Sequence, residues 1–244
     1  MSSNNGQDQQ VSVIPNSSDL DLFEGHTIEG EAFRRSLNFP QEHALIIYAG
    51  TFGAINGVSY LVRMARAARE LDLPLHFLAV GDGADQPHIE ALAQELDVLG
   101  SFVTLLPPKA KQEIPTVLAA ADVACSLFID LKPMWINSAN KFFDGLASGT
   151  PMAINYGGWQ ADLLKEASAG LVLPADDPQR GAEMITDLVA DRDRLDQMGR
   201  AARTLAEREF DRDKLAAQLE QVLFDSINDW HRRTPVHASS AKAP

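Results

Sequence analysis

Continuous apolar runs and amphipathic segments alternate along most of the chain. Two of the runs are ALIIYAG at 44–50 and LHFLAVGDG at 75–83, and each of them ends at a glycine. Short runs that are apolar throughout, without polar alternation, indicate strands buried on both faces. Strands are expected at residues 44–50, 75–83, 102–108, 122–128, 151–155 and 170–178.

Segments with apolar residues at helical spacing separate and follow these runs. Helices are expected at residues 58–71, 87–96, 114–121, 138–148, 161–167, 180–192, 195–210 and 214–230. Strands that alternate with helices predict an α/β domain with a doubly wound, Rossmann-like parallel sheet covered on both faces. Such sheets bind ligands at the carboxyl ends of their strands, near the point where the strand order reverses.

The two ends of the chain do not follow this pattern. Residues 1–10 and 231–244 are polar, and we predict that they are disordered. Residues 11–23, VSVIPNSSDLDLF, begin with a short β-rich run that leads into a Pro-Asn turn. Residues 24–40 are mixed and polar, and their pattern predicts no regular element.

The most informative segment is SANKFFDGLASGTPMAINYGG at 138–158. An Asn-Lys pair opens an amphipathic helix that carries one acid, Asp144, and a short apolar strand with a Gly-Gly turn follows. Taken alone, Asp144 would be read as a solvent-facing helix acid. Its surroundings instead favour a helix N-terminus and a ribose-binding carboxylate that point at one nucleotide diphosphate.

A glycine-rich turn, GTFGAING at 50–57, follows the first expected strand. Such a turn can bring backbone N–H groups close to a phosphate, although a plain strand-to-helix turn remains equally compatible. It does not match G-x-G-x-x-G, and no acid about 20 residues later is placed to read a ribose, which disfavours a nicotinamide site. The absence of the G-x-x-x-x-G-K-[ST] pattern argues against a P-loop NTPase.

Charge limits the classes of partner. The formal net charge of −13 gives a surface that does not attract nucleic acid or anionic lipid as a whole. An anionic ligand must therefore be bound by local features of the structure, such as helix N-termini and single basic residues. No apolar run approaches the roughly 18 residues of a membrane span, and the N-terminus lacks an apolar signal core. The expected location is the cytoplasm.

The residue types that bind metals do not form a pattern in this chain. Cys125 is the only cysteine, and its position in an apolar run favours a buried core thiol. The six histidines show no ligand spacing, so no metal site is predicted.

Residues 11–230 resemble the C-terminal, donor-binding half of a GT-B glycosyltransferase of family four, a family of retaining transferases. The resemblance rests on landmarks in the family's order: VIPNSSDLDLF, YAGTFGAING, LAVGDG, AAADVACSLF, the segment at 138–158, AGLVLPADDP and ARTLAEREFD. The form S-x-N-K-x-x-D is closest to the branch that builds bacterial surface polysaccharides, often with deoxy-amino sugars. As a member of this group, the protein is expected to use a nucleotide-sugar, UDP-linked, as substrate, without cofactor or metal.

The resemblance also implies roles for residues at the donor site. The N-terminus of the helix at 138–148 would stabilise the diphosphate, Asp144 would accept hydrogen bonds from the ribose, and backbone at 106–109 would hold the base. Gly53 would allow close approach to the phosphates. No catalytic residue is assigned. The expected donor-binding residues are Gly50, Thr51, Phe52, Gly53, Asn56, Gly81, Leu106, Lys109, Ser138, Ala139, Asn140, Lys141 and Asp144.

The chain departs from the family pattern at charged positions. Thr51 and Asn56 stand where the family commonly has Arg and Lys, which neutralise the diphosphate. The family also often has two glutamates that flank the helix at 138–148. Ile136 lies near the position of the first glutamate, and Asp144, whose side chain is shorter, stands at the position of the second. Lys141 is expected to replace part of the missing positive charge.

The family's second, acceptor-binding domain has no counterpart in this sequence. We expect an N-terminal stub and inter-domain segment at 1–40, a nucleotide-sugar-binding domain at 41–211, a crossing helix at 212–230 and a tail at 231–244. The expected partner is the missing acceptor domain or a partner subunit, through which the chain would contact the inner membrane peripherally. An apolar stripe on the crossing helix should then lie exposed.

Two alternatives remain open. One is a non-catalytic nucleotide-sugar-binding fragment, or one subunit of a split transferase. The other, which the transferase-like helix disfavours, is a UDP-sugar epimerase of the same architecture.

Overall fold

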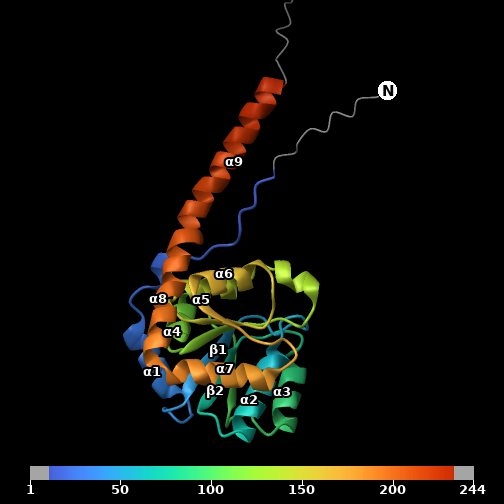
Figure 1. Ribbon diagram of the computed structural model, residues 1–244, viewed down its shortest axis with the longest axis vertical. Coiled ribbons are helices and arrows are strands. Elements are labelled where there is room, and N and C mark those ends of the chain that lie inside the picture. Colours follow the sequence, from blue (N-terminus) through green and yellow to red (C-terminus); the bar gives the residue numbers. More distant parts are fainter. Residues whose placement is uncertain (1–10, 234–244) are drawn as a thin grey trace, which may run out of the picture.

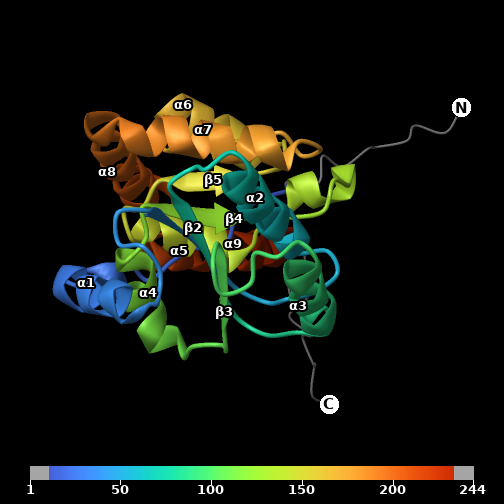
Figure 2. The same cartoon turned by 90° about the horizontal axis from the view of Figure 1, so that it is seen from below.

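A six-stranded parallel sheet forms the centre of the protein (Figures 1 and 2). The structure is a computed structural model, and it describes residues 11–233. The strand order β3-β2-β1-β4-β5-β6 confirms the predicted doubly wound parallel sheet. The strands are β1 (Ala44–Ala49), β2 (Leu75–Val80), β3 (Val103–Leu106), β4 (Val123–Ser126), β5 (Met152–Ile154) and β6 (Gly170–Val172).

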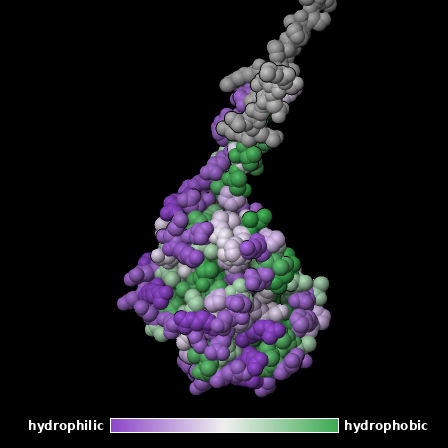
Figure 3. All heavy atoms as spheres, turned by 45° about the vertical axis from the view of Figure 1, so that its right-hand side comes forward, coloured by the Kyte–Doolittle hydropathy of each residue, from purple (hydrophilic) through white to green (hydrophobic). Residues whose placement is uncertain are grey.

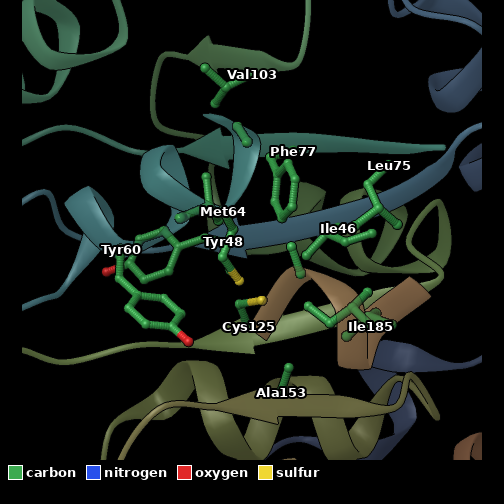
Figure 4. Packing of buried hydrophobic residues seen from close by; sticks show 14 of the residues in the cluster. Ile46, Tyr48, Tyr60, Met64, Leu75, Phe77, Val103, Cys125, Ala153 and Ile185 are labelled. Carbon is green, nitrogen blue, oxygen red and sulfur yellow. The ribbon is translucent and has the colours of Figure 1, made fainter. Parts of the chain in front are cut away.

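Side chains alternate between the two faces of the sheet, and both faces are covered. Ile46 and Tyr48 of β1 belong to one buried cluster, part of which is drawn in Figure 4, whereas Leu45 and Ile47 belong to the other. All four side chains are fully buried. This two-sided burial explains why the strands are apolar at successive positions instead of alternating with polar residues.

Helices α2, α3 and α7 contribute to the first cluster, and helices α4, α5 and α6 contribute to the second, while α8 contributes to both. Every helix expected from the sequence is present, with ends that differ by a few residues. The helices are α1 (Thr27–Ser36), α2 (Val58–Glu70), α3 (Gln86–Glu95), α4 (Ile114–Ala119), α5 (Asn140–Ala147), α6 (Trp159–Ala167), α7 (Pro178–Ala190), α8 (Arg192–Glu209) and α9 (Arg212–Arg233).

The region before β1 differs from the expectation. The β-rich run at its start joins no strand, and the sole ladder contact of residues 11–26 is an isolated bridge between Ser18 and Asp211. Helix α1 was not predicted, because its sequence lacks a clear apolar stripe. The 3-10 helices η1 (Leu20–Phe23), η2 (Lys111–Glu113) and η3 (Lys132–Ile136) were not predicted either.

An ion-pair network holds α1 on the domain. The Arg34 guanidinium donates to the Asp122 carboxylate at 2.8 Å and to the carbonyls of His43 and Ala120. Asp122 also accepts from the backbone N–H of Leu45 at 2.8 Å. Because these partners come from other parts of the fold, tertiary contacts rather than local periodicity stabilise α1.

Helix α9 extends away from the body of the domain (Figure 1). Its first apolar residue, Leu215, is buried, but Leu219, Leu223, Ile227 and Trp230 are between 49% and 61% exposed. Figure 3 shows apolar atoms uncovered where this helix leaves the body. The predicted exposure of the stripe is therefore confirmed for these residues.

The described residues do not reach the chain ends. The predicted disorder of residues 1–10 and 234–244 concerns parts of the chain outside the described residues. Residues 231–233 were also predicted to be disordered, but they form the last turn of α9. Within residues 11–233, none of the helices combines the length and the apolar character that crossing a bilayer requires.

His76 in β2 makes the fold sensitive to acid. Its side chain is fully buried, its Nε2 lies 2.9 Å from the Thr104 hydroxyl, and its ring stacks on Phe39. Burial lowers the pKa of His76 from 6.5 to about 4. The unfolded chain therefore binds a proton that the folded chain does not bind between pH 6.5 and 4, so the stability due to neutral His76 falls as the pH decreases.

We predict that neutral His76 contributes about 2 kcal/mol to the loss of unfolding free energy between pH 7 and pH 4.5. Urea unfolding of the wild type and of His76→Gln, whose side chain does not titrate, should show a shallower pH dependence in the variant. The exposed His88 provides a matched control, since His88→Gln should keep the wild-type dependence. Parallel profiles for wild type and His76→Gln would contradict the prediction.

Candidate functional site

A cavity of about 550 Å³ opens at the carboxyl edge of the sheet, at the ends of β1, β2 and β4. This is where the strand order reverses, between β1 and β4, as expected for a ligand site of a doubly wound sheet. The volume lies within the range of small-molecule sites. Of the predicted donor-binding residues, the cavity is lined by Gly50, Thr51, Asn56, Gly81, Lys109, Ala139, Asn140, Lys141 and Asp144.

Four predicted residues do not line this cavity. Phe52 is 1% exposed and packs in the core, so its side chain supports the glycine turn from beneath. Gly53 belongs to the same turn, and its carbonyl accepts from the Asn56 backbone N–H at 2.9 Å. Leu106 accepts from the backbone N–H of Gly81 at 3.0 Å. Ser138 is the fourth, and its hydroxyl accepts from the backbone N–H of Asn16 at 3.1 Å.

Close backbone packing shapes the glycine turn. Gly57 has a φ of 58°, and a Cβ atom there would lie 2.8 Å from the backbone of Phe128. At Gly81, a Cβ would overlap the carbonyl oxygen of Gly50. Both positions therefore require glycine, and this packing brings the ends of β1, β2 and β4 together.

Tyr48 and Asn56 fix the side of the turn that faces the cavity. The Tyr48 hydroxyl donates to the Thr51 carbonyl at 2.8 Å, and the Asn56 amide donates to that hydroxyl at 3.3 Å. Burial raises the pKa of Tyr48 to about 12, so it stays neutral at physiological pH. Asn56 thus takes part in a chain of neutral hydrogen bonds.

The N-terminus of α5 lies at the cavity wall. The residues before the helix are fixed by the Asn137 side-chain oxygen, which accepts from the Ala139 N–H at 3.2 Å. In the first turn of the helix, the Phe142 N–H donates to the Ala139 carbonyl. The backbone N–H groups of Asn140 and Lys141 make no hydrogen bond to any residue in the described range. These open donors and the helix dipole favour an anion at this end of α5.

Lys141 supplies a positive charge beside these donors. Its Nζ lies 4.6 Å from the centre of the Phe128 ring and 5.4 Å from that of Tyr48. Burial lowers the pKa of Lys141 from 10.5 to about 8. No carboxylate within residues 11–233 forms an ion pair with Lys141, whereas the second lysine of the cavity, Lys109, pairs with Glu113 at 3.1 Å.

The Phe128 ring beneath Lys141 is held in place by the end of the neighbouring strand. The Asn155 side chain accepts from the Phe128 backbone N–H at 2.9 Å and donates to the Phe128 carbonyl at 2.8 Å. Both residues are buried. This paired contact fixes the backbone after β4 and, with it, the aromatic surface that Lys141 covers.

Asp144 lies one turn after Asn140 on the same side of α5. Its Oδ1 accepts from the Ser18 hydroxyl at 2.7 Å. Burial raises the pKa of Asp144, while the Ser18 hydrogen bond and the charge of Lys111 lower it. Asn140, Lys141 and Asp144 thus bring an amide, a cation and an acid to one wall of the cavity.

The sequence interpretation missed several residues of this site. Tyr48 was read as a strand residue, because its apolar neighbours masked its contact with the glycine turn. Phe128 was placed at the end of a strand but was not predicted as a binding residue. Asn16 and Ser18 were assigned to an inter-domain segment, and they contact residues more than 120 positions away, as the separations of 122 and 126 show. No local pattern in the sequence indicates such a contact.

Across residues 11–233, no three His, Cys, Asp or Glu side chains are grouped so that they could share an ion. Cys125 is buried at the back of the cavity, which confirms the predicted core thiol, and burial raises its pKa to about 12.

Comparison with known proteins places this geometry in a family. The sequence model of the family described as glycosyl transferases group 1 matches residues 29–205. The chain is 29% identical over 198 residues to the D-inositol 3-phosphate glycosyltransferase of Corynebacterium urealyticum, a match that covers 75% of this chain and 44% of that protein. The chain spans about half the length of the curated relatives that it matches.

Solved structures share the fold. The structure of HepE from Anabaena in complex with UDP and glucose matches with a TM-score of 0.75 and 18% identity, covering 88% of this chain and 57% of that one. The C-terminal domain of LpcC, a glycosyl transferase group 1 family protein from Francisella tularensis, matches with a TM-score of 0.63 and 12% identity. That match covers 80% of this chain and 99% of the other. Since the family match spans the whole sheet and the cavity, the chain belongs to the group 1 glycosyl transferases and has their GT-B-type, Rossmann-like fold.

Proposed function

We propose that the chain forms the donor-binding part of a retaining glycosyltransferase of family four that uses a UDP-linked sugar. The observation that carries this proposal is the wall of the cavity formed by α5. Its open N–H groups, Lys141 and Asp144 lie together at the point where the strand order reverses. A nucleoside diphosphate presents anionic and hydroxyl groups that match these three features.

In the proposed pose, the diphosphate lies against the N-terminus of α5. The N–H groups of Asn140 and Lys141 donate to phosphate oxygens, and the Lys141 ammonium balances part of the charge. This arrangement compensates for the missing cations at Thr51 and Asn56, both of which line the same cavity. The backbone of the glycine turn at Gly50 and Thr51, which line the cavity, approaches the phosphates from the opposite side.

The nucleoside occupies the part of the cavity near Asp144. The carboxylate accepts hydrogen bonds from the ribose, and its burial strengthens those bonds because bulk water competes less. The base lies along the segment that follows β3, where Pro108 and Lys109 line the cavity. The backbone groups of this segment provide the donors and acceptors for the base edge.

The proposed chemistry is stabilisation of the leaving nucleoside diphosphate. Negative charge grows on the diphosphate as the bond to the sugar breaks, and the sugar acquires oxocarbenium character. A fixed helix N-terminus and a desolvated lysine stabilise that charge more strongly than they stabilise the bound donor. Acceptor contacts would come from a second domain or a partner subunit that covers α9.

The biological setting is part of the same proposal. We assign the chain to bacterial polysaccharide or glycoconjugate synthesis in the cytoplasm, with peripheral contact to the inner membrane through the acceptor-binding partner. A second candidate function is that of a subunit that binds the nucleotide-sugar without transferring the sugar. The observation that favours it is the chain of neutral hydrogen bonds at Tyr48, Thr51 and Asn56, which stands in place of two cations of the family pattern. Sugar transfer by the purified chain alone, compared with transfer after addition of the partner, distinguishes the two.

The proposal predicts that the purified chain binds UDP without an added divalent cation. Positive charge for the diphosphate comes from α5 and Lys141, so a chelator should leave the affinity unchanged. Calorimetric titration with UDP, in the presence and absence of EDTA, measures this. Loss of binding on chelation would show that a metal ion is needed, and no binding under either condition would refute the donor-binding role.

Asp144→Ala should weaken UDP binding by about 1.5–3 kcal/mol, the range for hydrogen bonds to a charged group. Folding should persist, because the carboxylate faces the cavity and supports little of the core. Asp187→Ala provides the control, since Asp187 is an exposed acid on a helix that does not line the cavity. Equal affinities for the wild type and Asp144→Ala would show that the Asp144 carboxylate makes no hydrogen bond to the ribose.

The pKa of about 8 for Lys141 predicts a pH dependence of UDP binding. The ammonium is charged below this pKa and attracts the diphosphate, and bound diphosphate raises the pKa further. Affinity should therefore be about tenfold lower at pH 9 than at pH 7. Lys141→Met should bind weakly at both values, and Lys165→Met, at an exposed lysine of α6, should keep the wild-type profile. A flat wild-type profile would be inconsistent with this role of Lys141.

A further inference from the structure

A segment that precedes the α/β domain crosses the start of α5. The backbone N–H of Asn16 donates to the Ser138 hydroxyl at 3.1 Å, and the Asn16 side-chain amide donates to the Ser138 carbonyl at 2.6 Å. The same amide donates to Oδ1 of Asn140 at 3.1 Å. Asn16 thus fastens both the residues before α5 and the first side chain of the helix.

Ser18 makes the second contact with α5, through the 2.7 Å hydrogen bond from its hydroxyl to Oδ1 of Asp144. Its backbone is anchored on both sides, since its N–H donates to the Phe210 carbonyl at 3.0 Å and its carbonyl accepts from the Arg212 N–H at 3.1 Å. Ser18 is 3% exposed. The hydroxyl is therefore fixed relative to the helix by hydrogen bonds that do not involve α5.

These contacts leave complementary groups for a ligand. Asn140 and Asp144 are four residues apart on α5, so they lie on one side of the helix, and both line the cavity. With Oδ1 of Asn140 occupied by Asn16, its NH₂ group remains to donate. With Oδ1 of Asp144 occupied by Ser18, its Oδ2 accepts no hydrogen bond from any described residue.

We infer that Asn16 and Ser18 are positioning residues for the donor site, Asn16 orienting Asn140 toward the diphosphate and Ser18 orienting Asp144 toward the ribose. This inference rests on the proposed donor-binding function. Both side chains would otherwise rotate about two bonds, and fixing them before the ligand arrives removes that ordering cost from binding.

The neighbouring ion pair keeps the segment in place when a hydroxyl is removed. Asp19 accepts from the Arg212 guanidinium at 2.5 Å, and the backbone hydrogen bonds of Ser18 do not depend on its side chain. Ser18→Ala therefore deletes one hydrogen bond to Asp144 while the segment stays anchored. Ser18→Thr retains a hydroxyl and is the conservative comparison.

The test compares ligands that differ in one part. Dissociation constants for UDP, 2′,3′-dideoxy-UDP and uridine are measured by ligand-observed NMR for the whole chain. Ser18→Ala should weaken UDP about 5- to 10-fold and leave 2′,3′-dideoxy-UDP within about twofold, so that discrimination between them falls, whereas Ser18→Thr should retain it. Asn16→Ala should weaken UDP about 3- to 5-fold and leave uridine unchanged.

Ser148→Ala is the matched control, because the Ser148 hydroxyl donates to the Gly145 carbonyl at the far end of α5, outside the cavity. It should leave all three affinities as in the wild type. Thermal unfolding verifies that each variant is folded.

Each unfavourable outcome points to a different failure. A wild type that does not bind UDP, or that binds 2′,3′-dideoxy-UDP equally well, overturns the proposed function and this inference with it. A wild type that discriminates while Ser18→Ala discriminates equally overturns only the role of Ser18. Variants that weaken all three ligands alike show that Asn16 and Ser18 support the fold and do not position the site.

Discussion

Both faces of the parallel sheet must be covered, and the position of the cavity follows from this constraint. After β1 the chain turns to α2, whose Val58 and Leu61 pack on one face. After β4 it turns to α5, whose Phe142 and Phe143 pack on the other face. Because β1 and β4 are neighbours, the two loops diverge and leave a crevice between them. The cavity therefore lies between these loops, and its wall is the exposed end of a helix that the core requires.

The proposed diphosphate site, in a chain with a net charge of −13, depends on local positive potential. Lys141 provides it at an energetic cost, since its ammonium lies against two aromatic rings and loses hydration, which lowers its pKa. The ammonium is already dehydrated in the free protein. A diphosphate that binds there would therefore displace little water from it. The open N–H groups of α5 act in the same way, because no rearrangement is needed before they can donate.

The sequence was sufficient to predict the sheet and the α-helices after β1, and nine of the thirteen predicted donor-binding residues line the cavity, because burial on two faces and the α5 segment leave strong local patterns. Helix α1 was missed, since Arg34 and Asp122 stabilise it through contacts between distant parts of the chain. Phe52 and Leu106 were correctly placed near strand ends, but core packing and a backbone hydrogen bond occupy them. Side-chain direction at a loop depends on packing, which a linear pattern does not contain.

The geometry of the α5 wall of the cavity is consequently not a property of the α/β core alone. The core places Asn140 and Asp144 on one side of α5, yet both side chains accept hydrogen bonds from a segment that lies outside the strand–helix alternation. That segment is held by residues 210–212, which connect α8 to α9, through the bridge between Ser18 and Asp211. The hydrophobic pattern thus determines the fold, whereas the polar geometry of this wall depends on a few hydrogen bonds that Asn16 and Ser18 make with α5. The segment that contains these two residues carries no pattern that predicts such contacts.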